Sequence, residues 1–188
     1  MAAFVLKYRL NETLADPRKF AGELMGLFKE ALSGTGPPPD LREPRATQDA
    51  LRAMDVVRST AGHWNIDPTR IGMIGFSAGA ITTLDAVVTA SSAKRPAFIG
   101  YVYGPMVART VPADAPAMFV AISLDDRLFG RQGFGLVENW QKAGRPVELH
   151  AYENGGHGFG LGRSGTTSTL LMDQFFAWVK SGGWLDQK

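Results

Sequence analysis

The feature that most constrains how this chain folds is a serine between glycines, directly after a short apolar run. Residues 71–74 (Ile-Gly-Met-Ile) are followed by residues 75–79 (Gly-Phe-Ser-Ala-Gly). This G-x-S-x-G pattern is typical of a sharp turn from a strand into a helix, which presents the serine hydroxyl above the sheet edge. Small residues fit there because the turn crowds the backbone two positions before and after the serine. We therefore expect Ser77 on such a turn, followed by a helix from Ala78 to about Ala90.

Three histidines are available as a base for this serine. A serine hydroxyl becomes a good nucleophile only when an imidazole removes its proton and a carboxylate holds that imidazole in one tautomer. His157 is the best candidate, because residues 155–160 (Gly-Gly-His-Gly-Phe-Gly) can carry an imidazole into a site without side-chain collisions. His150 lies in the strand-like run before this loop, and we expect it to pack there or to face solvent. We expect His63 to be a surface residue or a charge partner of a nearby helix end.

Two adjacent aspartates are candidates for the carboxylate. Asp125 and Asp126 follow residues 117–122 (Ala-Met-Phe-Val-Ala-Ile), a pattern typical of a buried strand. One of the two would be buried against His157, and the other would cap the following turn or pair with Arg127. The residue pattern by itself leaves this choice open.

Helix-like and strand-like segments alternate along the chain. Asp16 and Pro17 indicate a helix start, as its N-cap and its first-turn proline. Such alternation predicts an α/β protein, a three-layer α/β/α sandwich around a mainly parallel sheet of about five strands. The expected strands are residues 3–8, 71–74, 97–103, 117–122 and 147–152, the expected helices are residues 17–32, 45–61, 78–90, 135–143 and 167–180, and residues 33–39 form a loop.

The composition is that of one ordinary globular domain over residues 1–188. Hydrophobic residues make up 45% of the chain, and the net charge of +2 comes without a run of Lys or Arg, so we expect no nucleic-acid partner. No apolar stretch approaches the ~20 residues that span a membrane, and we expect no membrane partner. Because the chain has no cysteine, disulfides and thiolate metal sites are excluded, and we expect neither metal nor cofactor. Residues 1–7 lack a signal-peptide pattern, so the cytoplasm is the expected location, with a longer secreted form as the alternative.

Five segments of the chain together resemble a known family, in the family's order and at similar spacing over essentially the whole chain. On these segments the chain resembles the α/β-hydrolase superfamily, specifically the acetyl-xylan-esterase-like carboxylesterases related to dienelactone hydrolases. The resemblance implies a reduced α/β-hydrolase fold, with Ser77 as nucleophile and His157 as base. It also implies Asp126 rather than Asp125 as the acid, and the N–H of Ala78 as an oxyanion-hole donor. The matching segments are residues 4–10, 66–72, 75–79, 147–152 and 155–160.

The chain departs from this family at its start. Family members carry further strands and a His-Gly-Gly-Gly-like loop before the segment that matches residues 4–10, and that loop supplies oxyanion-hole donors. The chain therefore resembles an N-terminally shortened domain in which Ala78 is the one evident donor. The strand expected at residues 3–8 would have to pair directly with the strand before Ser77, leave an edge exposed, or find a partner chain. We therefore expect a homo-oligomer, a dimer or larger.

Together these observations predict a serine carboxylesterase. We expect it to hydrolyse short-chain acyl esters, with acetyl esters and acetylated sugars among them, through an acyl-enzyme on Ser77. Its partner would be a small-molecule ester. One alternative is a catalytically weak hydrolase that serves as a scaffold or assembly subunit, and another is a serine peptidase of the prolyl-oligopeptidase type. Tyr103 and Phe159 either line the acyl pocket or are ordinary core aromatics.

Overall fold

Helices and strands alternate as the sequence predicts. The computed structural model describes residues 1–10, 12, 15–33 and 39–185, so most of the loop expected over residues 33–39 lies outside the described residues. The helices are α1 (Pro17–Ser33), α2 (Pro44–Ser59), α3 (Ala78–Thr89), α4 (Gly135–Lys142) and α5 (Leu171–Ser181), with short 3-10 helices η1 (Ser92–Lys94) and η2 (Thr167–Leu170). The strands are β1 (Met73–Phe76), β2 (Phe98–Val102), β3 (Ala117–Ser123) and β4 (Val147–Tyr152).

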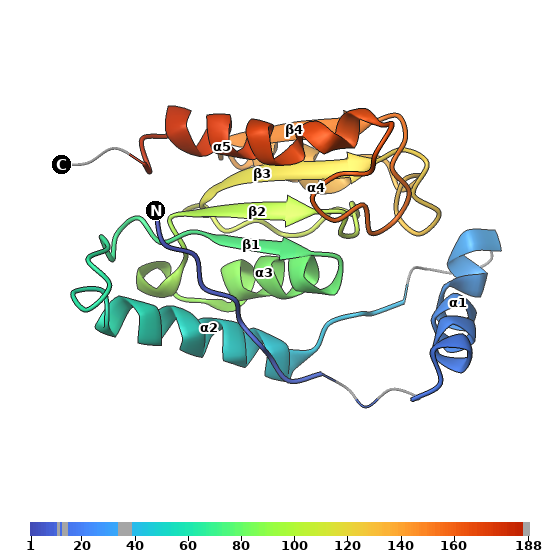
Figure 1. Cartoon of the computed structure of the whole chain (residues 1–188), viewed down its shortest axis with the longest axis horizontal. Helices are drawn as coiled ribbons and strands as arrows, with labels where there is room; N and C mark the ends of the chain where they lie inside the picture. Colours follow the sequence, from blue (N-terminus) through green and yellow to red (C-terminus); the bar gives the residue numbers. More distant parts are fainter. Residues whose placement is uncertain (11, 13–14, 34–38, 186–188) are drawn as a thin grey trace.

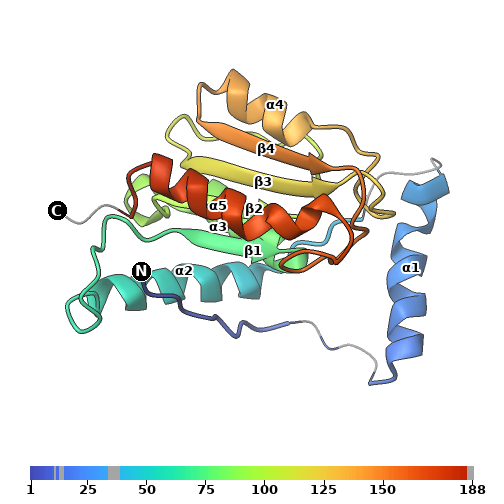
Figure 2. The same cartoon turned by 45° about the horizontal axis from the view of Figure 1, so that its top comes forward.

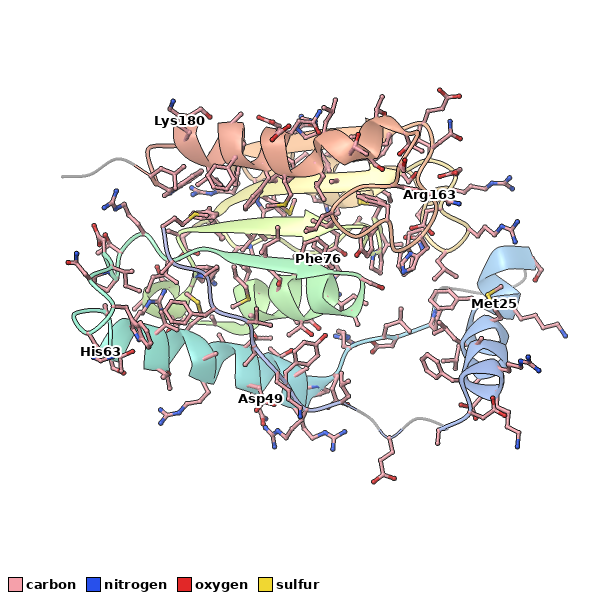
Figure 3. The ribbon with its side chains drawn as sticks, viewed as in Figure 1. Met25, Asp49, His63, Phe76, Arg163 and Lys180 are labelled. Carbon is pink, nitrogen blue, oxygen red and sulfur yellow. The ribbon has the colours of Figure 1, made fainter. Side chains whose placement is uncertain are left out.

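In the described residues the sheet has the strand order β1-β2-β3-β4, and each neighbouring pair is parallel. The register places Phe76 beside Val102 and Ser123 beside Tyr152. Since all strands run in one direction, the turns that follow them meet at one end of the sheet, on the right in Figure 1. Figure 3 shows Phe76, at the end of β1, and Arg163, in the segment after β4, at this same end.

Helices cover both faces of the sheet, which confirms the three-layer sandwich. Every residue of β2 and β3 is buried, as expected for central strands of a parallel sheet covered on both sides. Among the described residues, no helix combines the length and the apolar character needed to cross a membrane. One core joins the sheet to α3 and α4 through Ile99, Tyr101, Val120, Leu84 and Trp140, and the other joins it to α5 through Phe98, Phe119, Phe175 and Trp178.

The prediction of a strand at residues 3–8, and with it of about five strands, is wrong for the described part of the chain. This segment runs past α2 without joining the sheet (Figure 1). The apolar residues that suggested a strand are largely exposed in this segment. Phe4 meets Trp64 edge to face, with ring centroids 5.4 Å apart, while the neighbouring Val5 is fully exposed.

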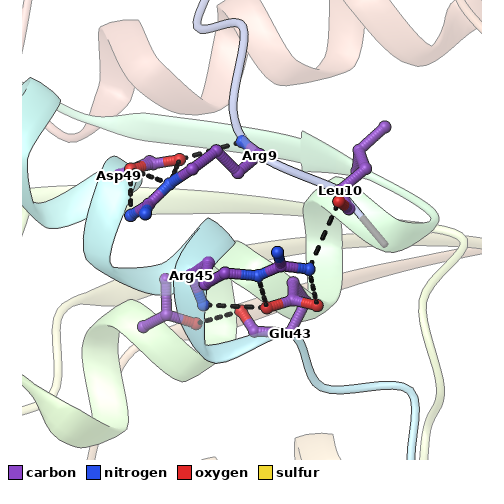
Figure 4. Close-up of polar contacts among 6 residues, drawn as sticks. Arg9, Leu10, Glu43, Arg45 and Asp49 are labelled. Carbon is purple, nitrogen blue, oxygen red and sulfur yellow. Dashed lines mark hydrogen bonds and ion pairs between the residues drawn. The ribbon is translucent and has the colours of Figure 1, made fainter. Parts of the chain in front are cut away.

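Polar contacts hold the end of this segment against α2 (Figure 4). The backbone N–H of Arg9 donates to the Asp49 carboxylate at 2.8 Å, and the Arg9 guanidinium adds a two-pronged contact, with Nη2 2.8 Å from Oδ1. Arg45 Nη2 donates to the carbonyl of Leu10 at 3.3 Å. The segment is therefore fixed to a helix by side chains, whereas a strand would be fixed by backbone pairing.

Helix α1 stands apart from the sandwich, beside the end of the sheet where the turns after the strands meet (Figures 1 and 2). Several of its apolar side chains are exposed, among them Met25 and Leu27. Phe28 is the exception, because it is only 1% exposed and packs edge to face on Phe129, with ring centroids 5.7 Å apart. Phe28 and the partly buried Leu24 thus tie this helix to the rest of the protein.

Candidate active site

Ser77 lies on the sharp turn between β1 and α3 that the sequence predicts. Its backbone has φ 51° and ψ −116°, a left-handed conformation that a residue with a side chain rarely adopts. The N–H of Ser77 donates to the carbonyl of Val102 at 3.0 Å, so the ladder between β1 and β2 continues up to the turn. The serine is therefore held at the carboxyl end of β1 with its side chain free of the sheet.

The two glycines of the pattern differ in what they do. A Cβ on Gly75 would lie 2.0 Å from the carbonyl oxygen of Gly79 and 2.5 Å from the Thr83 hydroxyl, so only glycine fits there. A Cβ on Gly79 would have the Tyr8 hydroxyl as its nearest neighbour, at an ordinary 3.8 Å. The expectation that both positions need a small residue for steric reasons is therefore correct at Gly75 and wrong at Gly79.

Hydrogen bonds bring the three sequence-predicted side chains together in one chain of contacts. Ser77 Oγ lies 2.8 Å from His157 Nε2, and His157 Nδ1 lies 2.9 Å from Asp126 Oδ2. The serine comes from the turn after β1, the aspartate from the loop after β3, and the histidine from the loop after β4. The Asp126 side chain is fully buried, whereas the His157 side chain is 26% exposed. A buried carboxylate, a half-buried imidazole and a hydroxyl thus lie in the order that nucleophilic activation of a serine needs.

The adjacent aspartates have separate tasks. Asp126 faces His157 with Oδ2, while its Oδ1 accepts the N–H of Leu128 at 2.8 Å. Asp125 does not face the imidazole. Of the two aspartates that the residue pattern left open, Asp126 is the one that contacts His157 in this structure, and its role as the acid stays a prediction.

Asp125 instead holds the beginning of the histidine loop. Its Oδ1 accepts the backbone N–H groups of Gly155 at 3.0 Å and Gly156 at 2.7 Å, together with the buried Ser123 hydroxyl at 2.5 Å. These donors, the Ser123 hydroxyl first, hold the pKa of Asp125 below its usual value. Sequence reasoning missed this role and expected Asp125, if not the acid, to cap its own turn or to pair with Arg127.

Aromatic rings support the imidazole from two sides. Tyr103 and Phe129 both meet His157 edge to face, with ring centroids 5.4 and 5.3 Å away. Tyr103 has a positive φ of 38°, and burial raises the pKa of its hydroxyl. Tyr103 and Phe159 are both buried and pack on each other at 4.8 Å. Of the two interpretations open for this pair, core aromatics fits: they stand behind His157 rather than lining the pocket at Ser77.

A cavity of about 170 Å³ opens at the serine and the histidine. Apart from Ser77 and His157, its lining is apolar, and part of it comes from α1. Phe20, Leu24 and Phe28 recur at helical spacing in α1, but such spacing carries no signal of which surface the apolar face covers. The lining residues are Leu24, Phe28, Leu41, Ser77, Ala78, Ile81, Leu128, Phe129 and His157.

Ala78 is the first residue of α3 and lines the same cavity. The N–H groups of a first helical turn have no carbonyl one turn earlier to bond, and the helix dipole makes this end favourable for negative charge. The first helical bonds to Ser77 come from the N–H groups of Ala80 and Ile81. The backbone at Ala78 is therefore placed next to Ser77 where an anion would be stabilised.

The other two histidines lie away from this site. His150, on β4, stacks on Phe119 with ring centroids 4.8 Å apart and contacts Glu148 at 2.7 Å, so it packs within the strand as expected. His63 follows α2 and meets Trp64 edge to face. Within the described residues, no group of three or more His, Asp or Glu is arranged to hold a metal ion.

This fold is that of a known class of proteins. A family model described as the alpha/beta hydrolase fold matches residues 37–118. The chain has an α/β-hydrolase fold, in a reduced form with a four-stranded parallel sheet in the described residues. Among curated proteins, none matches the sequence.

Solved structures of hydrolases resemble the chain closely in shape. One is an alpha/beta hydrolase enzyme from a Medee basin deep-sea metagenome library, with 26% identity and a TM-score of 0.64 over 74% of this chain and 65% of that one. The chain thus spans a little less than two thirds of that enzyme's length. Another is an acetyl ester-xyloside bifunctional hydrolase from Caldicellulosiruptor lactoaceticus, with 22% identity and a TM-score of 0.67 over 77% and 68% of the two chains. The carboxylesterase Cest-2923 from Lactobacillus plantarum has 16% identity and a TM-score of 0.66 over 94% and 84%.

Proposed function

We propose that this protein is a serine carboxylesterase that hydrolyses short-chain acyl esters through an acyl-enzyme on Ser77. The observation that carries the proposal is the hydrogen-bonded chain Ser77–His157–Asp126, with distances of 2.8 and 2.9 Å, at the wall of an apolar cavity. The fold and its structural neighbours among esterases support the same reaction class.

In the first half of the reaction, Ser77 attacks the ester carbonyl carbon while its hydroxyl proton passes to His157 Nε2. Asp126, bonded to Nδ1, holds the imidazole in the tautomer that leaves Nε2 free to accept and stabilises the imidazolium that forms. When the tetrahedral intermediate collapses, the bond to the alcohol oxygen breaks. The alcohol leaves with the proton from Nε2, and the acyl group stays on Ser77.

In the second half, water replaces the alcohol. His157 Nε2 takes a proton from the water molecule, whose oxygen attacks the acyl carbon. The proton returns to Ser77 as the carboxylic acid departs, so the enzyme is regenerated. In both halves the negative charge develops on the carbonyl oxygen, and the Ala78 N–H at the start of α3 would stabilise it.

The size and lining of the cavity suggest which acyl groups react. Its volume is about 170 Å³, well above what one water molecule needs, and its walls beyond Ser77 and His157 are apolar. Such a space accommodates an acetyl or another short acyl group and offers no charged partner for a peptide. Acetyl esters, acetylated sugars among them, are therefore the substrates we propose.

Hydrolysis of 4-nitrophenyl acetate tests the proposal. Replacing Ser77 by Ala should lower kcat about 10⁴-fold or more, because the nucleophile is lost. Ser59→Ala, at the exposed end of α2, is the matched control and should keep the wild-type rate. Equal background rates in the wild type and Ser77→Ala would refute the esterase assignment, and cleavage of peptide amides at comparable rates would favour a peptidase instead.

A further inference from the structure

A second cavity adjoins the one at Ser77. It measures about 450 Å³ and shares four lining residues with the smaller cavity: Phe28, Leu41, Ile81 and Phe129. These four residues therefore form a wall that the two spaces share. The residues that line only the larger cavity are Pro39, Asp40, Arg42, Pro105, Val107 and Arg109.

Phe28 is the shared lining residue that comes from α1. It is buried although α1 exposes Leu27 beside it at 59%, and its ring packs on Phe129, which in turn contacts His157. Ile81 and Phe129 are anchored in the core by α3 and by the turn after β3. Shortening Phe28 should therefore remove part of the wall between the cavities while Ile81 and Phe129 stay in place.

The polar part of the larger cavity is electrically balanced. Arg42 Nη2 lies 2.5 Å from Asp40 Oδ2, and Arg109 Nη2 lies 3.0 Å from Asp85 Oδ1. Asp85 is buried in α3, where burial raises its pKa and the charge of Arg109 opposes that shift. Each arginine thus has its own carboxylate, and neither a free anion nor a free cation would gain a new counter-charge.

The arginines and carboxylates at the larger cavity nevertheless keep some capacity for further hydrogen bonds. A guanidinium has five N–H donors and a carboxylate about four acceptor positions, so one ion pair uses only part of each. Uncharged groups that both donate and accept hydrogen bonds, hydroxyls above all, therefore suit the part of the larger cavity where the arginines and their carboxylates lie. The rest of the lining, Phe28, Ile81 and Val107 among it, suits an apolar ring or chain.

We propose that the larger cavity is the subsite for the alcohol half of the ester, and that Phe28 divides it from the acyl pocket at Ser77. This inference rests on the proposed esterase function. The alcohol that it takes has an apolar body and uncharged polar ends, and the acyl half occupies the small cavity. The loop after β2 supplies Val107 and Arg109 to this subsite.

The first test varies the alcohol half while the acyl half stays acetyl. Val107→Trp should fill the larger cavity from a position that does not itself line the pocket at Ser77. It should lower the ratio of kcat/KM for benzyl acetate over methyl acetate about tenfold or more. Leu27→Ala, on the exposed side of α1, is the control and should leave this ratio within twofold of the wild type. Because each ratio is compared with the wild type, the intrinsic reactivity of the esters cancels.

The second test concerns charge. The wild type should prefer 4-(acetoxymethyl)benzyl alcohol to 4-(acetoxymethyl)benzoate about tenfold in kcat/KM, since the carboxylate finds no unpaired cation.

The third test concerns the wall at Phe28. Phe28→Ala should raise the ratio of kcat/KM for hexanoate over acetate esters about tenfold, and Phe28→Leu should raise this ratio less.

The outcomes separate the two proposals. If the wild type hydrolyses both benzyl and methyl acetate but Val107→Trp leaves their ratio unchanged, the subsite is refuted and the esterase function stands. If the wild type prefers the ester that carries a carboxylate, the inference that the arginines at the larger cavity offer no unpaired positive charge is refuted. If the wild type hydrolyses none of these esters in a Ser77-dependent way, both proposals fail together.

Discussion

Ser77 Oγ and His157 Nε2 lie 2.8 Å apart although 80 residues separate them in the chain, and they come from the two outermost strands of the sheet. The turn after β1 and the loop after β4 are separated by three strand spacings, which is about 14 Å of sheet. The histidine loop must therefore reach back across β2 and β3 to meet the serine. Contacts that hold the start of this loop should consequently control the reaction from outside the Ser77–His157–Asp126 chain.

Asp125 is the clearest such contact, because one carboxylate oxygen accepts the N–H groups of both Gly155 and Gly156. Asp125→Ala removes the acceptor, and we predict that kcat for 4-nitrophenyl acetate falls about 10²-fold while KM changes little. Asp125→Asn keeps an oxygen that accepts the same donors, so its kcat should recover to within several-fold of the wild type. Steady-state assays with 4-nitrophenyl acetate measure kcat and KM for both variants. Circular dichroism checks that each variant is folded.

A purely structural role for Asp125 would give a different pattern. Both variants would then lose stability and active fraction together, with unchanged kcat per active site. Titrating active sites with a fluorophosphonate that labels Ser77 distinguishes these outcomes. Equal kcat per labelled site in Asp125→Ala and the wild type would contradict the positioning role.

The same carboxylate should make the protein sensitive to acid. The pKa of Asp125 is lower in the folded state than in the unfolded state, where it is about 4. The hydrogen bonds of its carboxylate therefore stabilise the native state fully at a pH above the unfolded pKa. This contribution is lost as the pH falls through the folded pKa. We predict that the wild type is more stable than Asp125→Ala at pH 7 and that the difference shrinks below about pH 4. Urea unfolding at both pH values measures it, and a difference independent of pH would contradict the assignment.

Asp126→Asn should affect chemistry far more than binding. The side chain is fully buried and bonded to His157 Nδ1, and an amide of the same shape favours the wrong imidazole tautomer. We predict a fall in kcat of about 10⁴-fold with KM within a few-fold of the wild type. Asp125→Asn is the matched control on the neighbouring residue. Comparable losses in both variants would mean that the two carboxylates share the role.

Features of this site that depend on a few neighbouring residues could be predicted from the sequence, whereas those that depend on contacts between distant segments could not. The turn at Ser77 and the loop at His157 are marked by local glycine patterns, and both lie where those patterns indicate. The packing of α1 over the serine is different, since the apolar spacing of Leu24 and Phe28 predicts a helix with a buried face but not the surface it covers. Long-range placement of this kind follows from tertiary packing, which no local pattern encodes.

The aspartates and the first residues show two further limits. Asp125 and Asp126 are chemically identical neighbours, and only the backbone direction after β3 decides which one faces the imidazole. Residues 3–8 are mostly apolar, as a strand would be, but the segment packs through Phe4 on Trp64 without pairing in the sheet. Apolar composition alone leaves backbone pairing undecided.

The two glycines around Ser77 should respond differently to the same change. Gly75→Ala places a Cβ 2.0 Å from the Gly79 carbonyl oxygen, and we predict a loss of about 3 kcal/mol in the free energy of unfolding. Gly79→Ala places its Cβ in ordinary contact within a helix, so the change should stay within about 1 kcal/mol in either direction. Chemical denaturation of both variants measures this, and equal losses would contradict the asymmetry.

We also propose that the protein associates in solution through the free edge of β1. In the described residues β1 pairs only with β2, and Ile74 on this strand is 37% exposed. Apolar side chains of the first ten residues, Phe4 and Val5 among them, are exposed as well. An unpaired strand edge with apolar neighbours favours pairing with another chain. Light scattering should therefore give the mass of a dimer or a larger assembly.

A charge placed on that edge tests where the association occurs. Ile74→Lys should shift the mass toward the monomer, because a lysine on an edge strand opposes pairing with a second chain. Val56→Lys, at a comparably exposed position on α2, is the matched control and should leave the mass unchanged. A wild type that remains a single monomeric species at micromolar concentration would contradict association, and a shift caused only by Val56→Lys would move the interface from β1 to α2.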